Sequence, residues 1–373
     1  MPKDIVEGRI AADTVARVTR EHVERLSRHK LLSGDIVYGR RGDIGRQALI
    51  RQEQEGWMCG TGCLRLSLGD KVIAPLFLHY YLRQDDVVSW ITNQAVGATM
   101  PNLNTGILRS VPVKFPPLPT QQRIAGILTA YDELIENSQR RIKILEAMAR
   151  ALYREWFVHF RFPGFENHPR VASALGEIPQ GWEVKKLKDV ADVNRAQIKV
   201  STAPDELQYI DISSVSPGQI NSVTTYAFLD APGRARRIVH HGDLLWSCVR
   251  PNRRSHAQVM RPEANTIAST GFAVLTATKI PFTFLYFATT TDDFVNFLVN
   301  NATGSAYPAV SGATFEKAEL IIPPAPLLKL FGDATIPMAE EIHTFQRQIQ
   351  NLRRTRDLLL PRLLSGQINV EAA

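Results

Sequence analysis

Two segments of the chain concentrate arginine, whose guanidinium group pairs in bidentate fashion with phosphate and with guanine. Residues 234–261 hold seven arginines against one acid, a net charge of +6, and residues 25–51 hold seven arginines and lysines against two acids, a net charge of +5. The whole chain carries +7, so everything outside these segments carries −4. The positive charge is therefore local, and it predicts two sites for an anionic partner.

Residues 249–258 (VRPNRRSHAQ) mix arginine with amide and hydroxyl side chains, which suits the reading of DNA bases better than a lysine-rich phosphate patch would. The loops at 97–106 (GATMPNLNTG) and 304–313 (GSAYPAVSGA) add hydroxyls, amides and one aromatic ring. Two alternatives stay open: the arginines could only solvate the surface, and the Gly-x-x-x-Pro loops could only be turns before a strand. The predicted DNA-binding residues are Arg40, Arg41, Arg46, Thr99, Asn102, Asn104, Arg234, Arg236, Arg237, Arg250, Asn252, Arg253, Arg254, Ser255, His256, Ser305 and Tyr307.

Motifs for catalysis do not accompany these residues. The sequence has no GxxxxGK[ST] phosphate loop, no HExxH pair and no GxSxG nucleophile elbow. Cys59 and Cys63 could join His240 and His241 as zinc ligands, but cysteines four apart in a strand-like stretch are more typical of a buried core. We therefore expect no catalytic residue and no bound metal.

One unit occurs twice along the chain. Three markers, Gly97, Pro101 and Pro116-Pro117, recur 207 residues later as Gly304, Pro308 and Pro323-Pro324, and Gly34-Asp35 recurs as Gly242-Asp243 after 208 residues. Such a long period indicates a tandem duplication of a domain rather than a solenoid. Only 33 residues precede Gly34, whereas 60 residues separate Trp182 from Gly242. We therefore expect the first copy to lack the first strand and helix of the unit. Two explanations stay open: the family tolerates a shorter first copy, or the chain is truncated at its N-terminus or its start was assigned late.

Each copy ends in a long helix with one apolar stripe. Apolar residues recur at alternating steps of four and three, as they do where one helix packs along another. Each stripe covers about 33 residues, or roughly 50 Å of helix. We expect Thr120 to cap the first helix and Pro337 to kink or delay the second. The helix-seam residues are Ile124, Leu128, Tyr131, Ile135, Ile142, Leu145 and Leu152 in the first copy and Ile342, Phe345, Ile349, Leu352 and Leu359 in the second.

These patterns predict an α+β protein with two tandem mixed α/β domains separated by two long antiparallel coiled-coil helices. The predicted boundaries are a first domain over 1–119, a central helix over 120–160, a linker over 161–180, a second domain over 181–325, a C-terminal helix over 326–366 and a tail over 367–373. Strands are expected at 35–38, 63–68, 111–115, 208–212, 243–249, 272–275 and 319–322, and short helices at 75–82 and 281–289.

Composition limits where the protein works. The sequence has no run of about 18 apolar residues that could span a bilayer, and residues 1–10 (MPKDIVEGRI) lack the apolar core of a signal peptide. Three cysteines are too few for a disulfide framework, which fits a reducing compartment. We therefore expect a cytoplasmic protein.

The chain resembles the specificity subunit of type I restriction–modification enzymes. The resemblance rests on GDIVYGRRGDIG from Gly34, the GATMPNL loop, the run VPVKFPPLPTQQRIAGIL that enters the first long helix, and the return of each in the second copy. IPQGWEVKKLKDVADV from Ile178 resembles the domain opening of the family, and LLPRLLSGQI resembles its closing segment. Two departures are visible: the first copy lacks the WE…L…VA opening, and the second has PPAPLLKLF in place of PPLPTQQRI.

The resemblance implies a non-catalytic DNA-recognition subunit. Its two target recognition domains would each read one half of a bipartite DNA sequence, and its helices would act as the spacer. Its partners would be double-stranded DNA, two methyltransferase subunits and ATP-dependent restriction subunits. S-adenosylmethionine, ATP and magnesium would be bound by those partners and no cofactor by this chain. Two other classes stay open: a fused restriction or methyltransferase enzyme, and a scaffold that binds only protein.

Overall fold

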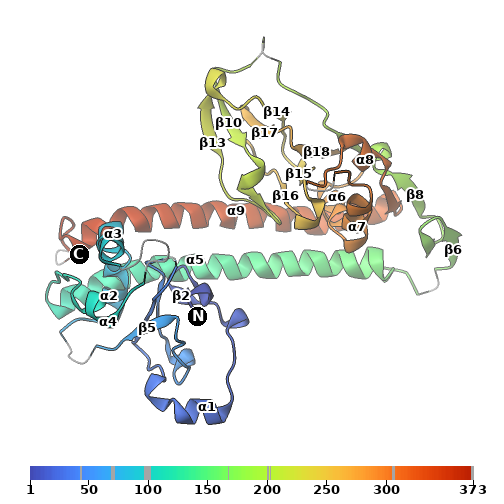
Figure 1. Cartoon of the computed structure of the whole chain (residues 1–373). Helices are drawn as coiled ribbons and strands as arrows, with labels where there is room; N and C mark the ends of the chain where they lie inside the picture. The colour runs from blue at the N-terminus through green and yellow to red at the C-terminus, as the bar shows by residue number, and fades with distance from the viewer. Residues whose placement is uncertain are drawn as a thin grey trace. The chain divides into compact units, whose positions relative to one another are not determined.

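The computed structural model describes residues 1–42, 44–68, 72–95, 102–166, 168–199, 201, 203–304 and 307–370. The chain divides into two compact units: unit 1 contains residues 1–138 and 348–373, and unit 2 contains residues 139–347. Two long helices, α5 (Leu118–Tyr153) and α9 (Ala325–Leu364), each contribute residues to both units (Figure 1). Within the described part of the chain, no helix is both long and apolar enough to cross a bilayer.

Unit 1 is built on a three-stranded antiparallel sheet in the order β4-β3-β5. All of β3 is buried: Ile36 and Tyr38 pack toward the short helices, and Val37 packs toward the opposite face, as expected from alternation along a strand. The elements are β1 (Ile5–Val6), β2 (Arg9–Ile10), α1 (Arg20–Arg25), β3 (Ile36–Gly39), β4 (Gln47–Leu49), β5 (Cys63–Leu66), α2 (Pro75–Tyr81), α3 (Asp85–Gln94) and α4 (Thr105–Arg109).

Unit 2 repeats this sheet with one more strand, in the order β16-β15-β18-β9. Trp246 on β15 takes the place of Tyr38 on β3, and its partner on the neighbouring strand is His256 where Tyr38 faces Gln47. The elements of this half of unit 2 are β8 (Glu183–Lys186), β9 (Ala191–Val193), β15 (Leu244–Ser247), β16 (His256–Gln258), β18 (Phe272–Ala277), α6 (Phe282–Thr289), α7 (Asp292–Asn300), α8 (Gly312–Lys317) and β19 (Glu319–Ile322).

A second sheet of unit 2, in the order β13-β10-β17-β14, covers the back of the first. Leu245 and Val274 from the first sheet meet Ile210 and Ala268 from the second in one buried apolar cluster. The remaining elements of unit 2 are β6 (Arg170–Ser173), β7 (Gly176–Pro179), β10 (Glu206–Ile210), β11 (Val215–Ser216), β12 (Gln219–Ile220), β13 (Thr224–Ala227), β14 (Ala235–Ile238) and β17 (Thr266–Ser269).

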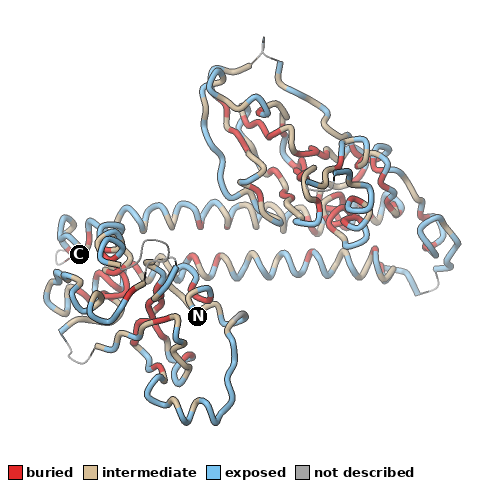
Figure 2. The backbone as a smooth tube through the Cα atoms, in the orientation of Figure 1, coloured by how far each residue is buried: buried red, intermediate tan, exposed pale blue. Residues whose placement is uncertain are grey.

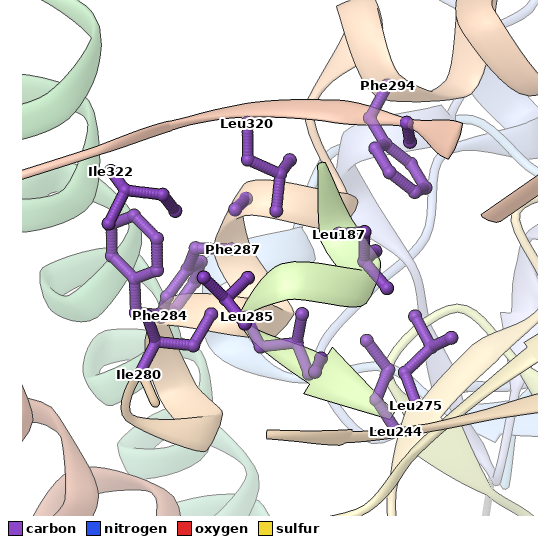
Figure 3. Close-up of a cluster of buried hydrophobic side chains, with 14 of the residues drawn as sticks. Leu187, Leu244, Leu275, Ile280, Phe284, Leu285, Phe287, Phe294, Leu320 and Ile322 are labelled. Atoms are coloured by element: carbon purple, nitrogen blue, oxygen red, sulfur yellow. The ribbon is translucent and has the colours of Figure 1, made fainter. Parts of the chain in front are cut away.

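Helices α2 and α6 join each sheet to the long helices. Phe77 of α2 and Phe284 of α6, which are 207 residues apart, are both fully buried. Phe77 packs with Ile124 and Leu128 of α5, and Phe284 packs with Phe331 of α9. In unit 2 this core also receives Leu187, Leu320 and Ile322 (Figure 3).

The long helices run antiparallel where they meet inside each unit. In unit 1, Asp132 of α5 pairs with Arg356 of α9; in unit 2, Arg141 of α5 lies over the ring of Phe345 of α9. All the helix-seam residues are buried or half-buried, while most other positions on both helices are exposed (Figure 2). The predicted α+β fold class, with two mixed domains and two long antiparallel helices, is confirmed.

Several local predictions are wrong. Helix α5 begins at Leu118, so Thr120 lies inside it rather than at its cap. Helix α9 begins at Ala325, so Pro337 does not delay it; the kink at Pro337 stays a prediction. The segment expected to be a linker contains the β6-β7 hairpin and the buried residues Phe162 and Ile178.

The predicted strand over residues 111–115 is absent. Its counterpart β19 in unit 2 exists because it pairs with β8, and unit 1 contains no counterpart of β8 among its described residues. The apolar alternation of residues 111–115 is thus present in the sequence, but the partner that would make it a strand is not.

Candidate nucleic-acid interface

In unit 2 the two loops predicted to bind DNA lie against each other. Val249 and Ala309 form a bridge, the Arg250 N–H donates to the Pro308 carbonyl at 2.7 Å, and the Val310 N–H donates to the Cys248 carbonyl at 2.9 Å. The Arg250 guanidinium lies over the Tyr307 ring, 4.7 Å from its centroid. Residues 248–255 and 307–310 therefore form one surface, which we call the unit 2 loop pair.

The first of these loops is tightly folded. Arg250 and Arg254 have φ of 51° and 54°, a left-handed conformation that is uncommon for residues other than glycine. They flank the short helix η10 (Pro251–Arg253), whose Pro251 is buried, and Ser247 Oγ donates to the Val249 carbonyl at 3.0 Å. Strained backbone of this kind clusters at functional sites. It leaves Asn252 and Arg253 exposed at the tip.

The arginines of this loop differ in how they are held. Arg254 forms an ion pair with Asp292 at the start of α7; the two side chains are 40% and 82% exposed. The Arg253 side chain has no hydrogen-bond or ion-pair partner among the described residues. The Arg253 guanidinium could therefore bind an anion directly, whereas Arg254 would first have to break its ion pair with Asp292.

Three more predicted arginines lie on or beside β14. Arg234 is exposed, while Arg236 lies over the Phe228 ring at 5.5 Å and donates to the Ala235 carbonyl. Arg237 is half-buried, and burial lowers its pKa, although Cys248 nearby acts in the opposite sense. Of the three, Arg234 is the most open to a ligand.

His256 is a correction to the predicted set. Its side chain is 5% exposed on β16, and its ring lies 4.9 Å from that of Trp246 and 5.5 Å from that of Tyr286. Burial, and then the charges of Arg150 and Arg254, lower the pKa of His256 to about 4. It is a neutral core residue and cannot contact DNA from this position.

Unit 1 brings its two predicted loops together in the same way. Arg41 and Asn102 form a bridge, equivalent to that between Val249 and Ala309. The Leu103 N–H donates to the Arg40 carbonyl at 2.9 Å, and Arg40 Nε donates back to the Leu103 carbonyl at 3.1 Å. Arg41 and Arg46 are exposed. Residues 40–46 and 102–104 are therefore the unit 1 loop pair, with residue 43 outside the described residues.

Asn104 has a structural task in addition to its place in this loop pair. Its side-chain oxygen accepts from the Ile107 N–H at 2.9 Å and so caps α4. Ser311, 207 residues later, caps α8 in unit 2. In unit 2, Asn252, Arg253 and Tyr307 are exposed and Ser255 is half-buried. Thr99 and Ser305 lie outside the described residues.

Asp292 is the residue that sequence reasoning missed. Asp292 and Asp293 lie in the first turn of α7, where their negative charges interact favourably with the positive end of the helix dipole. Acids are common in the first turn of a helix, so the sequence gives no reason to connect Asp292 with Arg254, 38 residues away. Among the described residues, no group of three or more His, Cys, Asp or Glu side chains is placed to hold a metal ion.

Comparison with known proteins identifies the family. A family model described as the type I restriction modification DNA specificity domain matches residues 8–147 and 179–329. The type I restriction enzyme MjaIX specificity subunit of Methanocaldococcus jannaschii is 25% identical over 366 residues, covering 95% of this chain and 82% of the relative. The HindI specificity subunit of Haemophilus influenzae is 21% identical over 406 residues, covering 90% and 86%.

A solved structure shares the fold. The crystal structure of the type I restriction–modification S subunit from M. genitalium superposes with a TM-score of 0.58 at 16% identity, covering 90% of this chain and 84% of that one. The two family-model matches fall on the two copies of the repeat, one carrying each loop pair. The chain therefore belongs to the type I restriction–modification DNA specificity family.

Proposed function

We propose that this chain is the subunit that selects the DNA target of a type I restriction–modification complex, and that each unit reads one half of a bipartite target. The observation that carries the proposal is the recurrence of the loop pair. The Arg41–Asn102 bridge in unit 1 and the Val249–Ala309 bridge in unit 2 lie at equivalent positions of the repeat. In each unit the bridge joins an arginine-bearing loop to a second loop. Arginine and amide side chains at such a surface can read guanine and adenine edges in the major groove.

In this proposal the long helices set the distance between the half-sites. Helix α5 has 36 residues, or about 54 Å at 1.5 Å per residue. One turn of DNA is about 34 Å, so a helix of this length is sufficient to space two readers by a turn or more. The two readers would then bind successive major grooves.

The chain would work without catalytic residues or a cofactor of its own. Methyltransferase and ATP-dependent restriction subunits would dock on it in the cytoplasm. They would supply S-adenosylmethionine, ATP and magnesium chemistry. The burial of the thiols is consistent with this division: burial raises the pKa of Cys59 and Cys248 to about 11, so both are poor nucleophiles.

The test is methylation of DNA by the complex assembled with this chain. We expect no methyl transfer by the isolated chain, and transfer to one bipartite sequence when methyltransferase subunits are added. Methyl transfer by the chain alone would refute the non-catalytic role. Methylation at a continuous rather than a bipartite sequence would refute the two-reader model.

A further inference from the structure

The last arginine of each arginine-rich segment lies away from the loop pairs. Arg51 ends the first segment and Arg261 ends the second. Each follows the second strand of a hairpin: β3 and β4 are joined by residues 40–46, and β15 and β16 are joined by residues 248–255. Each arginine is therefore at the base of a hairpin, and the loop pair is at its tip.

The same backbone hydrogen bond closes the base of both hairpins. In unit 1 the Gly34 N–H donates to the Ile50 carbonyl at 2.9 Å. In unit 2 the Gly242 N–H donates to the Val259 carbonyl at 2.8 Å. The arginine at the base follows one residue later in unit 1 and two residues later in unit 2. The two arginines thus lie at nearly the same place in the fold, although they are not at the same position of the repeat.

In unit 2, Glu340 of α9 holds the base of the hairpin through two side chains. Arg261 Nη2 lies 2.5 Å from Glu340 Oε2, and His241 Nε2 lies 3.3 Å from Glu340 Oε1. Glu340 Oε2 is buried and accepts no hydrogen bond of good geometry from a described residue, so the positive charge of Arg261 offsets its burial. Each oxygen of this carboxylate therefore faces a partner of its own.

The backbone fixes the orientation of His241. The Arg261 N–H donates to His241 Nδ1 at 3.2 Å, so in the neutral ring the proton is on Nε2, which faces Glu340. The ring also lies edge-on to Phe282 at the start of α6, with 5.5 Å between the ring centroids. Arg261 has a φ of 48°, a left-handed conformation that costs energy in a residue with a side chain, so the surrounding contacts must hold it there.

Unit 1 has the same arrangement made from other positions of the repeat. Glu136 of α5 forms an ion pair with Arg9 of β2, and Arg51 Nη1 lies 3.7 Å from Glu136 Oε2. The residue 207 positions after Glu136 is His343 and not Glu340, so the carboxylate also comes from a different position. In both units one carboxylate of a long helix thus faces two side chains at the base of the sheet.

We give each of these clusters a name. The unit 1 anchor consists of Glu136, Arg9 and Arg51, and the unit 2 anchor consists of Glu340, Arg261 and His241.

Each anchor is a second attachment of a sheet to a long helix. The first attachment is the packing of α2 on Ile124 of α5 and of α6 on Phe331 of α9. At 1.5 Å per residue, Glu136 lies about 18 Å along α5 from Ile124, and Glu340 lies about 14 Å along α9 from Phe331. A single attachment leaves the hairpin free to swing about it, whereas two separated attachments fix its direction.

A swing of the hairpin would move the loop pair along bound DNA. Strand β15 has four residues, or about 14 Å at about 3.4 Å per residue, between the base and the loop pair. A rotation of about 14° over that length moves the tip by about 3.4 Å, which is the rise of one base pair. The direction of the hairpin therefore decides which base pair the loop pair meets.

We propose that the two anchors fix the number of base pairs between the half-sites, while the loop pairs read the half-site sequences. This inference rests on the proposed function. Glu136 and Glu340 are positioning residues, because they act through the hairpins and not by contact with DNA. Loss of an anchor should relax the spacing and leave the half-site sequences unchanged. An ion pair that served only stability would leave both unchanged, since exposed pairs contribute little to folding.

The first test is methyl transfer by the assembled complex to duplexes that carry the mapped half-sites at the parent spacing and at one base pair more or less. Glu340→Gln and Arg261→Ala should raise methylation at the two neighbouring spacings, relative to the parent spacing, by about fivefold, the factor that such an ion pair can supply. Arg261→Lys keeps the positive charge and should restore most of the discrimination. The matched control Glu341→Gln changes the next, exposed residue of α9 and should show the ratios of the parent chain.

The unit 1 anchor provides a second, independent copy of this test. Glu136→Gln should relax the spacing in the same assay. Glu133→Gln removes an exposed carboxylate about one turn earlier in α5 and should not.

A measurement without DNA tests the swing itself. Nitroxide labels introduced as non-canonical residues at positions 252 and 344 of the full chain lie at the hairpin tip and on α9, both within unit 2. Double electron–electron resonance gives the distribution of the distance between them. We expect a narrow distribution in the parent chain and in Glu341→Gln, and a broader one in Glu340→Gln and Arg261→Ala.

Two results would overturn the proposal. The first is spacing ratios and distance distributions in Glu340→Gln and Arg261→Ala that equal those of the parent chain. The second is an equal loss of methylation at all three spacings in Arg261→Ala, which would indicate a direct DNA contact. A parent complex that methylates no bipartite sequence would instead refute the proposed function, and the distance distributions would still decide whether Glu340 fixes the hairpin.

Discussion

Arg253 at the tip of the unit 2 loop pair gives the sharpest test of DNA binding, because its side chain is exposed and has no partner among the described residues. A contact from arginine to a base edge is worth about 1–3 kcal/mol, so Arg253→Ala should weaken binding to the target by about 5- to 150-fold. If Arg253 meets a phosphate instead, binding should weaken uniformly across sequences, and the slope of log K against log salt should fall by about 0.9.

Arg254 should contribute less because of Asp292. An exposed ion pair is worth about 0.2–1 kcal/mol, and in the proposed DNA complex Arg254 would lose its ion pair with Asp292. Arg254→Ala should therefore cost less than Arg253→Ala. Asp292→Asn should strengthen DNA binding, by up to about fivefold, because it releases the guanidinium.

The assay is fluorescence anisotropy of a labelled duplex carrying the mapped target, titrated with the assembled complex between about 50 and 200 mM salt. The matched control is Arg161→Ala, which removes another exposed arginine paired with a carboxylate, Glu155, at 3.2 Å. This control should bind as the parent does. The reasoning fails if Arg253→Ala binds like Arg161→Ala, or if Asp292→Asn weakens binding.

Three further predictions concern stability and spacing. Asp132→Asn should lower the free energy of unfolding by about 3 kcal/mol in chemical denaturation, since it leaves the Arg356 guanidinium, 12% exposed, without its main partner. The control Asp357→Asn removes an exposed partner of the same arginine and should cost under about 1 kcal/mol. Equal losses would show that Asp132 is not the main partner of Arg356. Burial, and then the charge of Arg83, lower the pKa of His79 to about 3 from 6.5, so the unfolded chain binds the extra proton and stability should fall as the pH drops from 6.5 toward 3. His79→Gln should flatten that pH dependence, and an unchanged profile would show that His79 is not its source. Inserting one heptad (7 residues) into both α5 and α9 should lengthen the gap between methylated half-sites by about 3 base pairs, since a heptad adds about 10 Å; altered half-sites at fixed spacing would refute the spacer role.

The repeat made much of the fold predictable. Both long helices follow from their apolar periodicity, and the strand expected at 319–322 coincides with β19. The same reasoning failed at residues 111–115, because a strand requires a partner as well as an alternating pattern. The sequence of residues 111–115 alone cannot show whether a strand equivalent to β8 lies beside it.

Composition pointed to the loops, but not to the contacts between them. Arginine content singled out one loop of each loop pair, and the structure leaves Arg41, Arg46 and Arg253 exposed there; that these residues bind DNA stays a prediction. His256 was misassigned because it closes an arginine-rich run, although it already begins β16 and turns inward beside Trp246. The ion pair of Arg254 with Asp292 and the stacking of Arg250 on Tyr307 depend on how the chain folds back, which local sequence does not reveal.

Methylome mapping of cells that carry single variants of the two loop pairs would show whether each unit reads its own half of the target. Arg41→Ala in unit 1 and Arg253→Ala in unit 2 would each be expressed with the partner methyltransferase subunits. We expect each variant to reduce or relax methylation through one half of the bipartite target, and the two variants to affect different halves. Changes in the same half for both variants, or an unaltered methylome in cells where both variants assemble into the complex, would show that the two units do not read separate half-sites.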